Sequence, residues 1–237
     1  MKTIRLTLLA LLVTTAFTSC QKINGKGEII STSRNIDGYS GIELAFDATV
    51  YYTQGANYSL EIEAQENIVG YIETIVKGND LVLREQHGIV LGKHDPIRIH
   101  ITAPDISSLA VSGSGIISVN GNWNGNILST VISGSGTIAV SSLKCDKISS
   151  DISGSGNIEI NGGSCNNEDF SISGSGSIDM RMVECATTYA DISGSGDIYA
   201  NVQKLLDAEI AGSGNIYYYG TPAINTRISG SGNIQRL

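Results

Sequence analysis

A Gly-Ser-Gly triplet recurs seven times in the second half of the chain, and its spacing constrains the fold more than any other feature. Successive triplets begin 21, 20, 20, 20, 18 and 18 residues apart. Their first glycines are Gly113, Gly134, Gly154, Gly174, Gly194, Gly212 and Gly230. A fixed period near 20 residues with strand-like flanks is typical of a solenoid, in which each repeat is one coil stacked on the previous coil.

The residues around each triplet alternate between apolar and polar, which indicates β-strands with one buried face. The inward positions two before and four after the first glycine are Val111 and Ile117, Ile132 and Ile138, Ile152 and Ile158, Ile172 and Ile178, Ile192 and Ile198, Ile210 and Ile216, and Ile228 and Ile234. An unbroken strand over residues 150–160 would span roughly 36 Å, too long for one side of a 20-residue coil. We therefore expect the strand to bend at the two glycines, which the alternation places inward. The sequence predicts an all-β fold, a single-stranded parallel β-helix (solenoid) of about seven regular coils of ~18–21 residues.

Three cysteines follow the same period. Cys145, Cys165 and Cys185 are 20 residues apart, so we expect them to stack on three successive coils. The favoured interpretation is a ladder of buried small side chains, because free cysteine is among the most often buried residue types. Neighbouring pairs would be close enough for a disulfide, but three cysteines cannot all pair with each other. We predict no metal site, because no histidine or second cysteine cluster accompanies them.

The N-terminus has the pattern of an export signal. Residues 1–19 carry Lys2 and Arg5, then an apolar run, then small residues, as a signal peptide does. The ending Phe17-Thr18-Ser19-Cys20 resembles a bacterial lipobox, which implies cleavage before Cys20 and lipidation of Cys20. Ordinary secretion with an unmodified cysteine is the alternative. The apolar run is shorter than the ~20 residues of a membrane-spanning helix, which argues against such a helix. A lipidated Cys20 would anchor the protein stably if it carried more than one acyl chain.

The remaining chain divides by composition. Residues 20–36 are polar and contain glycine, which predicts a lipid anchor followed by a tether. Residues 37–237 are expected to form the head, with an irregular part at 37–105 and the regular repeats at 106–237. The irregular part contains alternating strands, a short helical turn near residues 67–71 and a hairpin around residues 78–80, so we expect irregular first coils and an N-terminal cap.

The C-terminal coil raises the question of how the solenoid's end is covered. In the alternating register Ile234 and Arg236 point inward. We expect Arg236 to fold over the open end, which favours a monomer over an end-to-end dimer.

Charge and motif searches exclude several functions. The formal net charge is −8, and removal of Lys2 and Arg5 with the signal would make it −10, which argues against nucleic acid and against binding anionic lipid by charge. The triplets are not followed by Gly-Lys-Ser/Thr, so a phosphate-binding loop is excluded. His87, His94 and His100 fall at no ligand spacing. We predict no cofactor and no metal.

The triplets with their flanks carry a family resemblance. Ser153-Gly154-Ser155-Gly156-Asn157-Ile158, Gly212-Ser213-Gly214-Asn215-Ile216 and Ser229-Gly230-Ser231-Gly232-Asn233-Ile234 fit best, and other repeats depart at the asparagine. From about Asp37 to the C-terminus the chain resembles the auto-transporter adhesin, head GIN domain, family of exported proteins from Bacteroidetes-type bacteria. The resemblance implies a right-handed β-helix at the cell envelope and supplies no catalytic residue.

Two function classes remain open. The favoured class is a non-enzymatic, adhesin-like protein, lipid-anchored in the outer membrane, that binds a protein or glycan partner. Tyr217 and Tyr219 point outward around Tyr218 and are the candidate binding residues, with packing against a loop as the alternative. The other class is a polysaccharide-active lyase or hydrolase, for which carboxylates at equivalent outward positions are the candidates. These are Asp151 with Asp191, and Glu159 with Asp179.

The face of the outer membrane is a separate question. Gln21-Lys22-Ile23-Asn24 lacks the acidic run that resembles surface-export signals in these bacteria. We therefore favour the periplasmic face over the cell surface.

Overall fold

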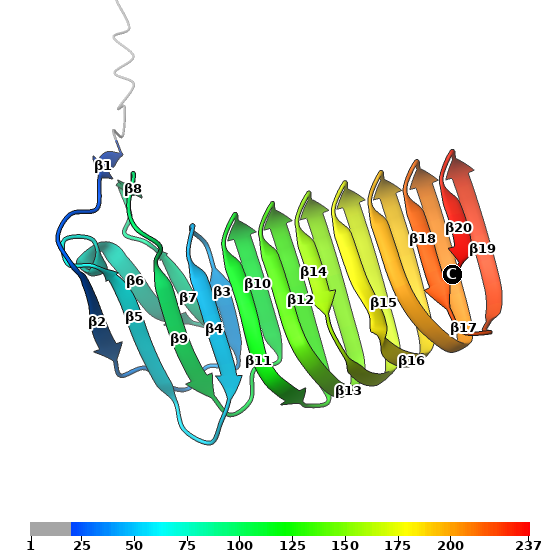
Figure 1. Ribbon diagram of the computed structural model, residues 1–237, viewed down its shortest axis with the longest axis horizontal. Helices are drawn as coiled ribbons and strands as arrows, with labels where there is room; N and C mark the ends of the chain where they lie inside the picture. The colour runs from blue at the N-terminus through cyan, green and yellow to red at the C-terminus, as the bar shows by residue number, and fades with distance from the viewer. Residues whose placement is uncertain (1–19) are drawn as a thin grey trace, which may run out of the picture.

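A computed structural model describes residues 20–237 of the chain, and the predicted signal peptide at 1–19 lies outside the described residues. The described part is all-β apart from a 3₁₀ turn at Val69–Tyr71. Parallel strands stack side by side along the long axis of the molecule into a β-solenoid of about six turns (Figure 1). The prediction of a parallel β-solenoid is confirmed. The structure has about six turns where the sequence predicted about seven regular coils, because seven triplets bound only six intervals.

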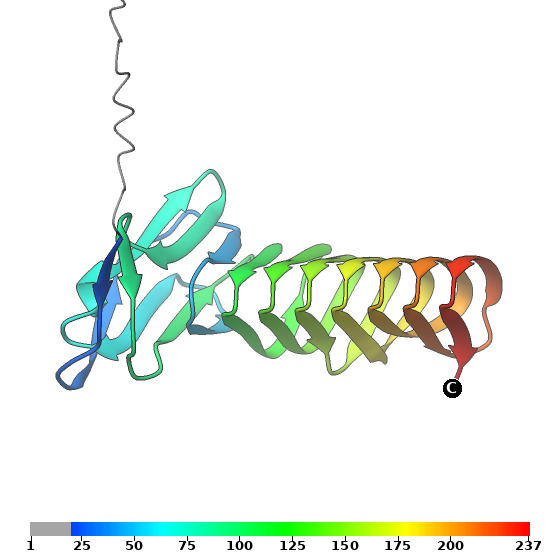
Figure 2. The same ribbon diagram turned by 90° about the horizontal axis from the view of Figure 1, so that it is seen from above.

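The regular coils are formed by the strands β10 to β20. Their bounds are β10 Ser108–Gly113, β11 Ile116–Asn124, β12 Ile127–Gly134, β13 Thr137–Gly154, β14 Asn157–Ile160, β15 Gly163–Gly174, β16 Ser177–Gly194, β17 Asp197–Gly212, β18 Asn215–Tyr219, β19 Ala223–Gly230 and β20 Asn233–Arg236. Each coil pairs in parallel with the next, residue for residue over most of its length. Figure 2 shows the coils repeating with nearly constant shape from β10 to β20.

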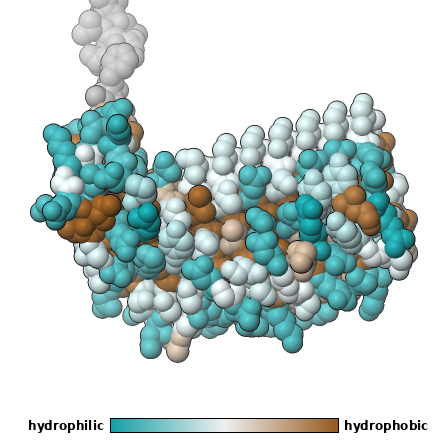
Figure 3. Space-filling view, viewed as in Figure 1, coloured by the Kyte–Doolittle hydropathy of each residue, from teal (hydrophilic) through white to brown (hydrophobic). Residues whose placement is uncertain are grey.

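The Gly-Ser-Gly triplets form one corner of every coil. Strands β10, β12, β13, β15, β16, β17 and β19 all end at the first glycine of a triplet, along the upper edge in Figure 1. These glycines have φ between +121° and +139°, a backbone region that other residues rarely adopt. The serines between the glycines are exposed, and in Figure 3 the upper edge is a row of near-white projections.

The two glycines of a triplet are constrained by different contacts, which corrects the prediction that both face inward. Gly156 is buried, and a Cβ there would lie 2.5 Å from Ile132 Cγ2. Gly154 is half-buried, and a Cβ there would lie 2.4 Å from the carbonyl oxygen of Gly134 in the preceding coil. The first glycine is therefore required by positive φ and by close stacking of coils, and the second by the core.

Two ladders of aliphatic side chains flank the corner inside the solenoid. The ladder after the triplets joins Ile117, Ile138, Ile158, Ile178, Ile198, Ile216 and Ile234 in strand register. The ladder before the triplets joins Val111, Ile132, Ile152, Ile172, Ile192, Ile210 and Ile228. All are at most 2% exposed except at the last coil. Burial of these side chains is the main stabilising contribution of the repeats.

The N-terminal part continues the parallel stacking with four strands and then adds three antiparallel strands. Its strands are β2 Ile29–Arg34, β3 Gly41–Leu44, β4 Thr49–Gln54, β5 Ser59–Gln65, β6 Ile72–Lys77, β7 Asp80–Glu85 and β9 Arg98–Ala103. Strands β3 and β4 pair in parallel with β10 and β11, and β7 and β9 pair in parallel with β3 and β4. Strands β6, β5 and β2 are then added antiparallel. The predicted hairpin at residues 78–80 is confirmed as β6–β7, and the predicted helical turn as Val69–Tyr71.

The prediction that residues 20–36 form a tether is wrong for most of the segment. Residues Gln21–Ile23 form β1, which pairs in parallel with β8 (Ile89–Leu91), and β2 pairs with β5 along its whole length. The backbone N–H of Lys26 also donates to Asn67 Oδ1 at 2.6 Å. These polar residues are ordered by strand partners far along the chain, which composition does not reveal. Cys20 is exposed and directly precedes β1.

The last coil leaves apolar side chains exposed, and the predicted cap by Arg236 remains a prediction. Arg236 pairs with Tyr218 at the expected register, but its side chain is exposed. Ile224 and Ile228 on β19 remain 41% and 45% exposed.

Candidate functional site

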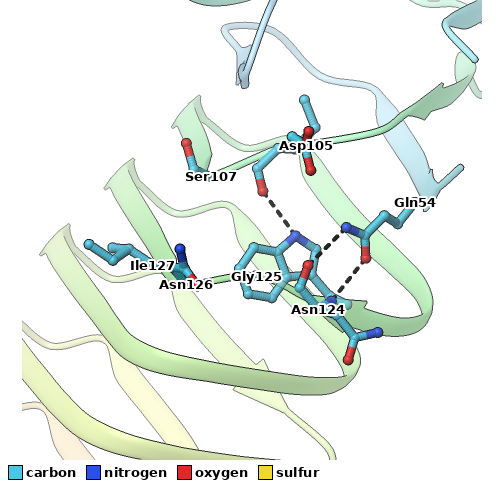
Figure 4. A pocket seen from close by; sticks show the side chains of 9 residues that line it. Gln54, Asp105, Ser107, Asn124, Gly125, Asn126 and Ile127 are labelled. Atoms are coloured by element: carbon cyan, nitrogen blue, oxygen red, sulfur yellow. Dashed lines mark hydrogen bonds between the residues drawn. The ribbon is translucent and has the colours of Figure 1, made fainter. Parts of the chain in front are cut away.

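Two adjoining pockets run along a second corner of the coils, where the loop at residues 124–126 forms a wall of both. The pocket in Figure 4 has a volume of ≈ 430 Å³ and its neighbour ≈ 520 Å³. The first is lined by Gln54, Asp105, Ile106, Ser107, Trp123, Asn124, Gly125, Asn126 and Ile127. The second is lined by Asn124, Gly125, Asn126, Lys144, Cys145, Asp146, Ser164, Cys165 and Asn166. We call the two together the amide trough, after its asparagine and glutamine side chains.

The amide of Gln54 fixes the wall of the first pocket. Gln54 Nε2 donates to the carbonyl oxygen of Asn124 at 2.9 Å, and the N–H of Asn124 donates back to Gln54 Oε1 at 2.9 Å (Figure 4). Gln54 Nε2 also donates to the carbonyl oxygen of Pro104 at 3.0 Å. Trp123 is 3% exposed, and its Nε1 donates to the carbonyl oxygen of Ile106 at 2.9 Å. These bonds join β4, the loop before β10 and the end of β11 into one preformed surface.

The second pocket is built from equivalent turns of successive coils. The N–H groups of Asp146 and Lys147 donate to the carbonyl oxygen of Asn126 at 2.9 and 3.0 Å, which stacks one turn on the other. In the next turn Asn166 Nδ2 donates to Asp146 Oδ1 at 3.0 Å. Asn126, Asp146 and Asn166 are all exposed. Hydrogen-bond donors and acceptors therefore line the trough at the spacing of stacked strands.

The tyrosines predicted as binding residues lie on a different surface. Tyr217 and Tyr219 are half-buried, and Tyr218 between them packs against the core. The Tyr217 ring stacks on Tyr199 with centroids 4.9 Å apart, and the guanidinium of Arg181 lies 4.2 Å from the centroid of the Tyr199 ring. One face of Tyr217 is thus already occupied, and neither Tyr217 nor Tyr219 lines the amide trough.

The carboxylates considered for catalysis do not line the pockets either. Asp151 and Asp191 flank Ser171 in register, and partial burial, with a contribution from the charge of Asp169, raises the pKa of Asp151. Asp179 pairs with Glu159 in register, but its Oδ2 forms an ion pair with Arg181 Nη2 at 2.6 Å. Neither pair forms part of the trough.

The three cysteines lie directly opposite one another in β13, β15 and β16, and all three are free and buried. Cys145 and Cys165 are each 7% exposed and line the second pocket. The ladder is thus adjacent to the amide trough, a position that the repeat spacing alone did not reveal.

A buried carboxyl beside the cysteines was missed by the sequence analysis. Glu168 is 0% exposed, accepts a hydrogen bond from Thr188 Oγ1 at 2.6 Å, and lies 3.7 Å from Cys165 Sγ. Burial raises the pKa of Glu168 well above its ordinary value. The signal was present in the 20-residue period, because Ile148, Glu168 and Thr188 occupy one inward register.

Fold and site together define a β-solenoid protein with a preformed trough bordered by amide side chains. The chain belongs to the family described as "Putative auto-transporter adhesin, head GIN domain", which matches residues 38–222. The predicted family resemblance is therefore confirmed, and membership indicates an extracellular or envelope-associated protein.

Solved structures share the fold over nearly the whole chain. A "putative adhesin" from Bacteroides fragilis NCTC 9343 is 25% identical with a TM-score of 0.86, covering 91% of this chain and 100% of that one. A "putative lipid binding protein" from Parabacteroides distasonis ATCC 8503 is 25% identical with a TM-score of 0.79, covering 92% and 100%. A "putative adhesin" from Parabacteroides merdae ATCC 43184 is 22% identical with a TM-score of 0.71, covering 92% and 99%. No curated protein matches the chain.

Proposed function

We propose that this protein is a non-enzymatic, adhesin-like binder, held at the outer membrane by a lipid on Cys20, that binds a glycan along the amide trough. The observation that carries the proposal is the trough itself, two adjoining pockets of ≈ 430 and ≈ 520 Å³ bordered by amide side chains from β4 and successive turns. Preformed concave sites of a few hundred Å³ with a few fixed polar groups are typical of small-ligand binding.

The chemistry of the lining favours a glycan. A sugar hydroxyl both donates and accepts hydrogen bonds, and amide side chains offer both functions from one planar group. Asn124 and Asn126 present such groups from one turn and Asn166 from the turn two coils further on, with Asp146 between them, so an extended chain of sugars would meet polar groups along the trough. A lipid chain would need a continuous apolar channel. Ile106, Trp123 and Ile127 border the first pocket, but Lys144 and Asp146 interrupt such a channel in the second.

A polysaccharide-cleaving activity is less well supported. Most glycoside hydrolases place a pair of carboxylates on either side of the scissile bond. In the part of the chain that the structure describes, the first pocket contains Asp105 and the second contains Asp146, so each has one carboxylate. We therefore propose binding without cleavage.

The trough proposal predicts a loss of binding from two small substitutions. Asn126→Ala combined with Asn166→Ala is expected to weaken binding of the tightest ligand from an array of bacterial, plant and mucin glycans about tenfold. Two lost hydrogen bonds are worth ~1–3 kcal/mol. Both side chains are exposed, and the one bond lost within the protein, from Asn166 to Asp146, lies at the surface, so the variant should unfold at nearly the same urea concentration as the wild type.

A matched control uses asparagines outside the trough that are likewise exposed. Asn157→Ala combined with Asn225→Ala should leave the affinity unchanged, because both residues are exposed on other strands. Equal losses of affinity in the two double variants would contradict a glycan site. So would an array on which no glycan binds, together with a protein that binds at the trough instead.

The proposed anchor makes a second prediction. Cys20→Ala should move the protein from the detergent phase to the aqueous phase of fractionated cells, because lipidation and the membrane attachment it provides would be lost. Since β1 begins at Gln21, the head would lie close to the membrane at its N-terminal end. Over residues 20–237, no helix has the length and apolar character needed to cross a membrane. Unchanged detergent partitioning of the variant would exclude Cys20 as the anchor.

The face of the membrane is tested separately. We propose the periplasmic face, because residues 21–24 lack an acidic run. Protease treatment of intact cells should leave the head uncut, and rapid cleavage would place the head on the cell surface.

A further inference from the structure

Three potential metal-ligand side chains meet inside the solenoid, next to the second pocket of the amide trough. The Sγ atoms of Cys165 and Cys185 and a carboxylate oxygen of Glu168 all lie within 4.8 Å of one another, and all three residues are buried. Cys165 and Glu168 come from β15 and Cys185 from β16, so two adjacent coils build the cluster. The cluster is unrelated to the glycan proposal and does not depend on it.

The register that Glu168 occupies does not require a carboxyl group in the other coils. The same inward register holds Leu128, Ile148 and Leu206 in other coils, where each packs in the core, and Thr188 in the next coil, where it bonds to Glu168; all four are fully buried. A fully buried carboxyl group costs free energy unless a specific partner compensates for its lost hydration. The two contacts to Glu168, from Thr188 and Cys165, are bonds from neutral donors. An aliphatic residue would satisfy the core without them, so the carboxyl points to a ligand.

We propose that Cys165, Cys185 and Glu168 bind one thiophilic divalent cation, with zinc as the best match. Zinc prefers four ligands drawn from thiolate, imidazole and carboxylate groups, and its bonds of ~2.0–2.3 Å place the ligand atoms within the spacing found here. Glu168 Oε2 accepts the hydrogen bond from Thr188, and Oε1 faces Cys165 Sγ. Thr188 would therefore orient the carboxylate while its other oxygen binds the metal, as hydrogen-bond partners of metal ligands commonly do.

Binding would involve deprotonation without any redox step. Both thiols and the carboxylic acid lose their protons to solvent, and three negative ligands then surround a doubly charged cation. The resulting single negative charge would lie next to the pocket that Lys144 and Cys165 both line. The cation would thus offset the free-energy cost of burying the carboxylate, because it places a positive charge next to it.

The second pocket provides the way in and the fourth ligand. Cys165 is 7% exposed and forms part of the wall of that ≈ 520 Å³ pocket, so a hydrated cation can reach it from solvent. The fourth coordination position would be filled by water from this pocket. Cys145 lines the same pocket and pairs with Cys165 in register, but it lies outside the cluster of three.

The test titrates the reduced, metal-free protein with cobalt(II), whose thiolate charge-transfer and visible bands report sulfur ligands and tetrahedral geometry. We expect one cobalt per chain, displaced by one equivalent of zinc. Zinc should also raise the unfolding temperature of the wild type, because a ligand that binds the folded state stabilises it. Cys165→Ala should abolish the thiolate band, and Glu168→Gln should weaken zinc affinity at least tenfold while the protein stays folded.

Cys145→Ala is the matched control, since it removes a stacked cysteine outside the cluster and should keep the stoichiometry and the thiolate band. A wild-type protein that shows no thiolate band and no thermal stabilisation by zinc would overturn the proposal. So would full zinc affinity in Glu168→Gln, or a Cys165–Cys185 disulfide that persists in the protein as isolated from cells. If Cys165→Ala does not fold, the Glu168→Gln result decides.

Discussion

Replacement of Ile158 by alanine is expected to lower the free energy of unfolding by ~2–5 kcal/mol. Ile158 is 1% exposed and stacks between Ile138 and Ile178 in the ladder after the triplets. The loss combines the transfer free energy of the removed methyl and methylene groups with a cavity that two rigid neighbouring coils cannot close. Urea denaturation followed by circular dichroism measures it.

The control for this prediction lies three residues earlier. Ser155 is exposed at the triplet corner, so Ser155→Ala should change the free energy of unfolding by less than ~0.5 kcal/mol. A larger loss for Ser155→Ala than for Ile158→Ala would contradict the assignment of inward and outward faces.

Gly154→Val is expected to destabilise the protein by ~2–6 kcal/mol. Gly154 has φ of +135°, a conformation that costs a branched residue ~1–3 kcal/mol. The new Cβ would also lie 2.4 Å from the carbonyl oxygen of Gly134, and relief of such overpacking costs another ~1–3 kcal/mol. The same urea series measures the effect.

Alanine at this position separates the backbone explanation from simple crowding by a large side chain. Gly154→Ala adds the Cβ alone, so most of the loss should persist, because both the positive φ and the contact with Gly134 involve that atom. A Gly154→Ala variant as stable as the wild type would show that the first glycine of the triplet is not required by its backbone.

The repeats were predictable because one physical requirement recurs in every coil. An inward isoleucine four residues after each first glycine must meet its equivalent in the next coil, and the ladder from Ile117 to Ile216 does so in strand register. The period therefore predicted register as well as fold class. The period did not distinguish the two glycines of a triplet, since alternation places both inward. Because the first glycine has positive φ, a Cβ added there would point toward the neighbouring coil.

The N-terminal segment and the trough were not predictable from the sequence, because both depend on distant partners. Residues Ile29–Arg34 have polar neighbours and no repeat, and they form a strand because β5 offers an open edge. The trough wall depends on Gln54 and Asn124, which are 70 residues apart in the chain. By contrast, Glu168 could have been found, because its inward register follows directly from the 20-residue period.

The most direct test of a glycan-binding solenoid is amide hydrogen exchange of the purified protein with and without its tightest array glycan. Bound glycan should slow exchange at residues 124–126, 144–146 and 164–166, the turns that line the amide trough. Exchange elsewhere on the coils, including residues 217–219, should stay the same. Protection confined to residues 217–219, or no protection in the three turns at saturating glycan, would contradict the trough as the binding site.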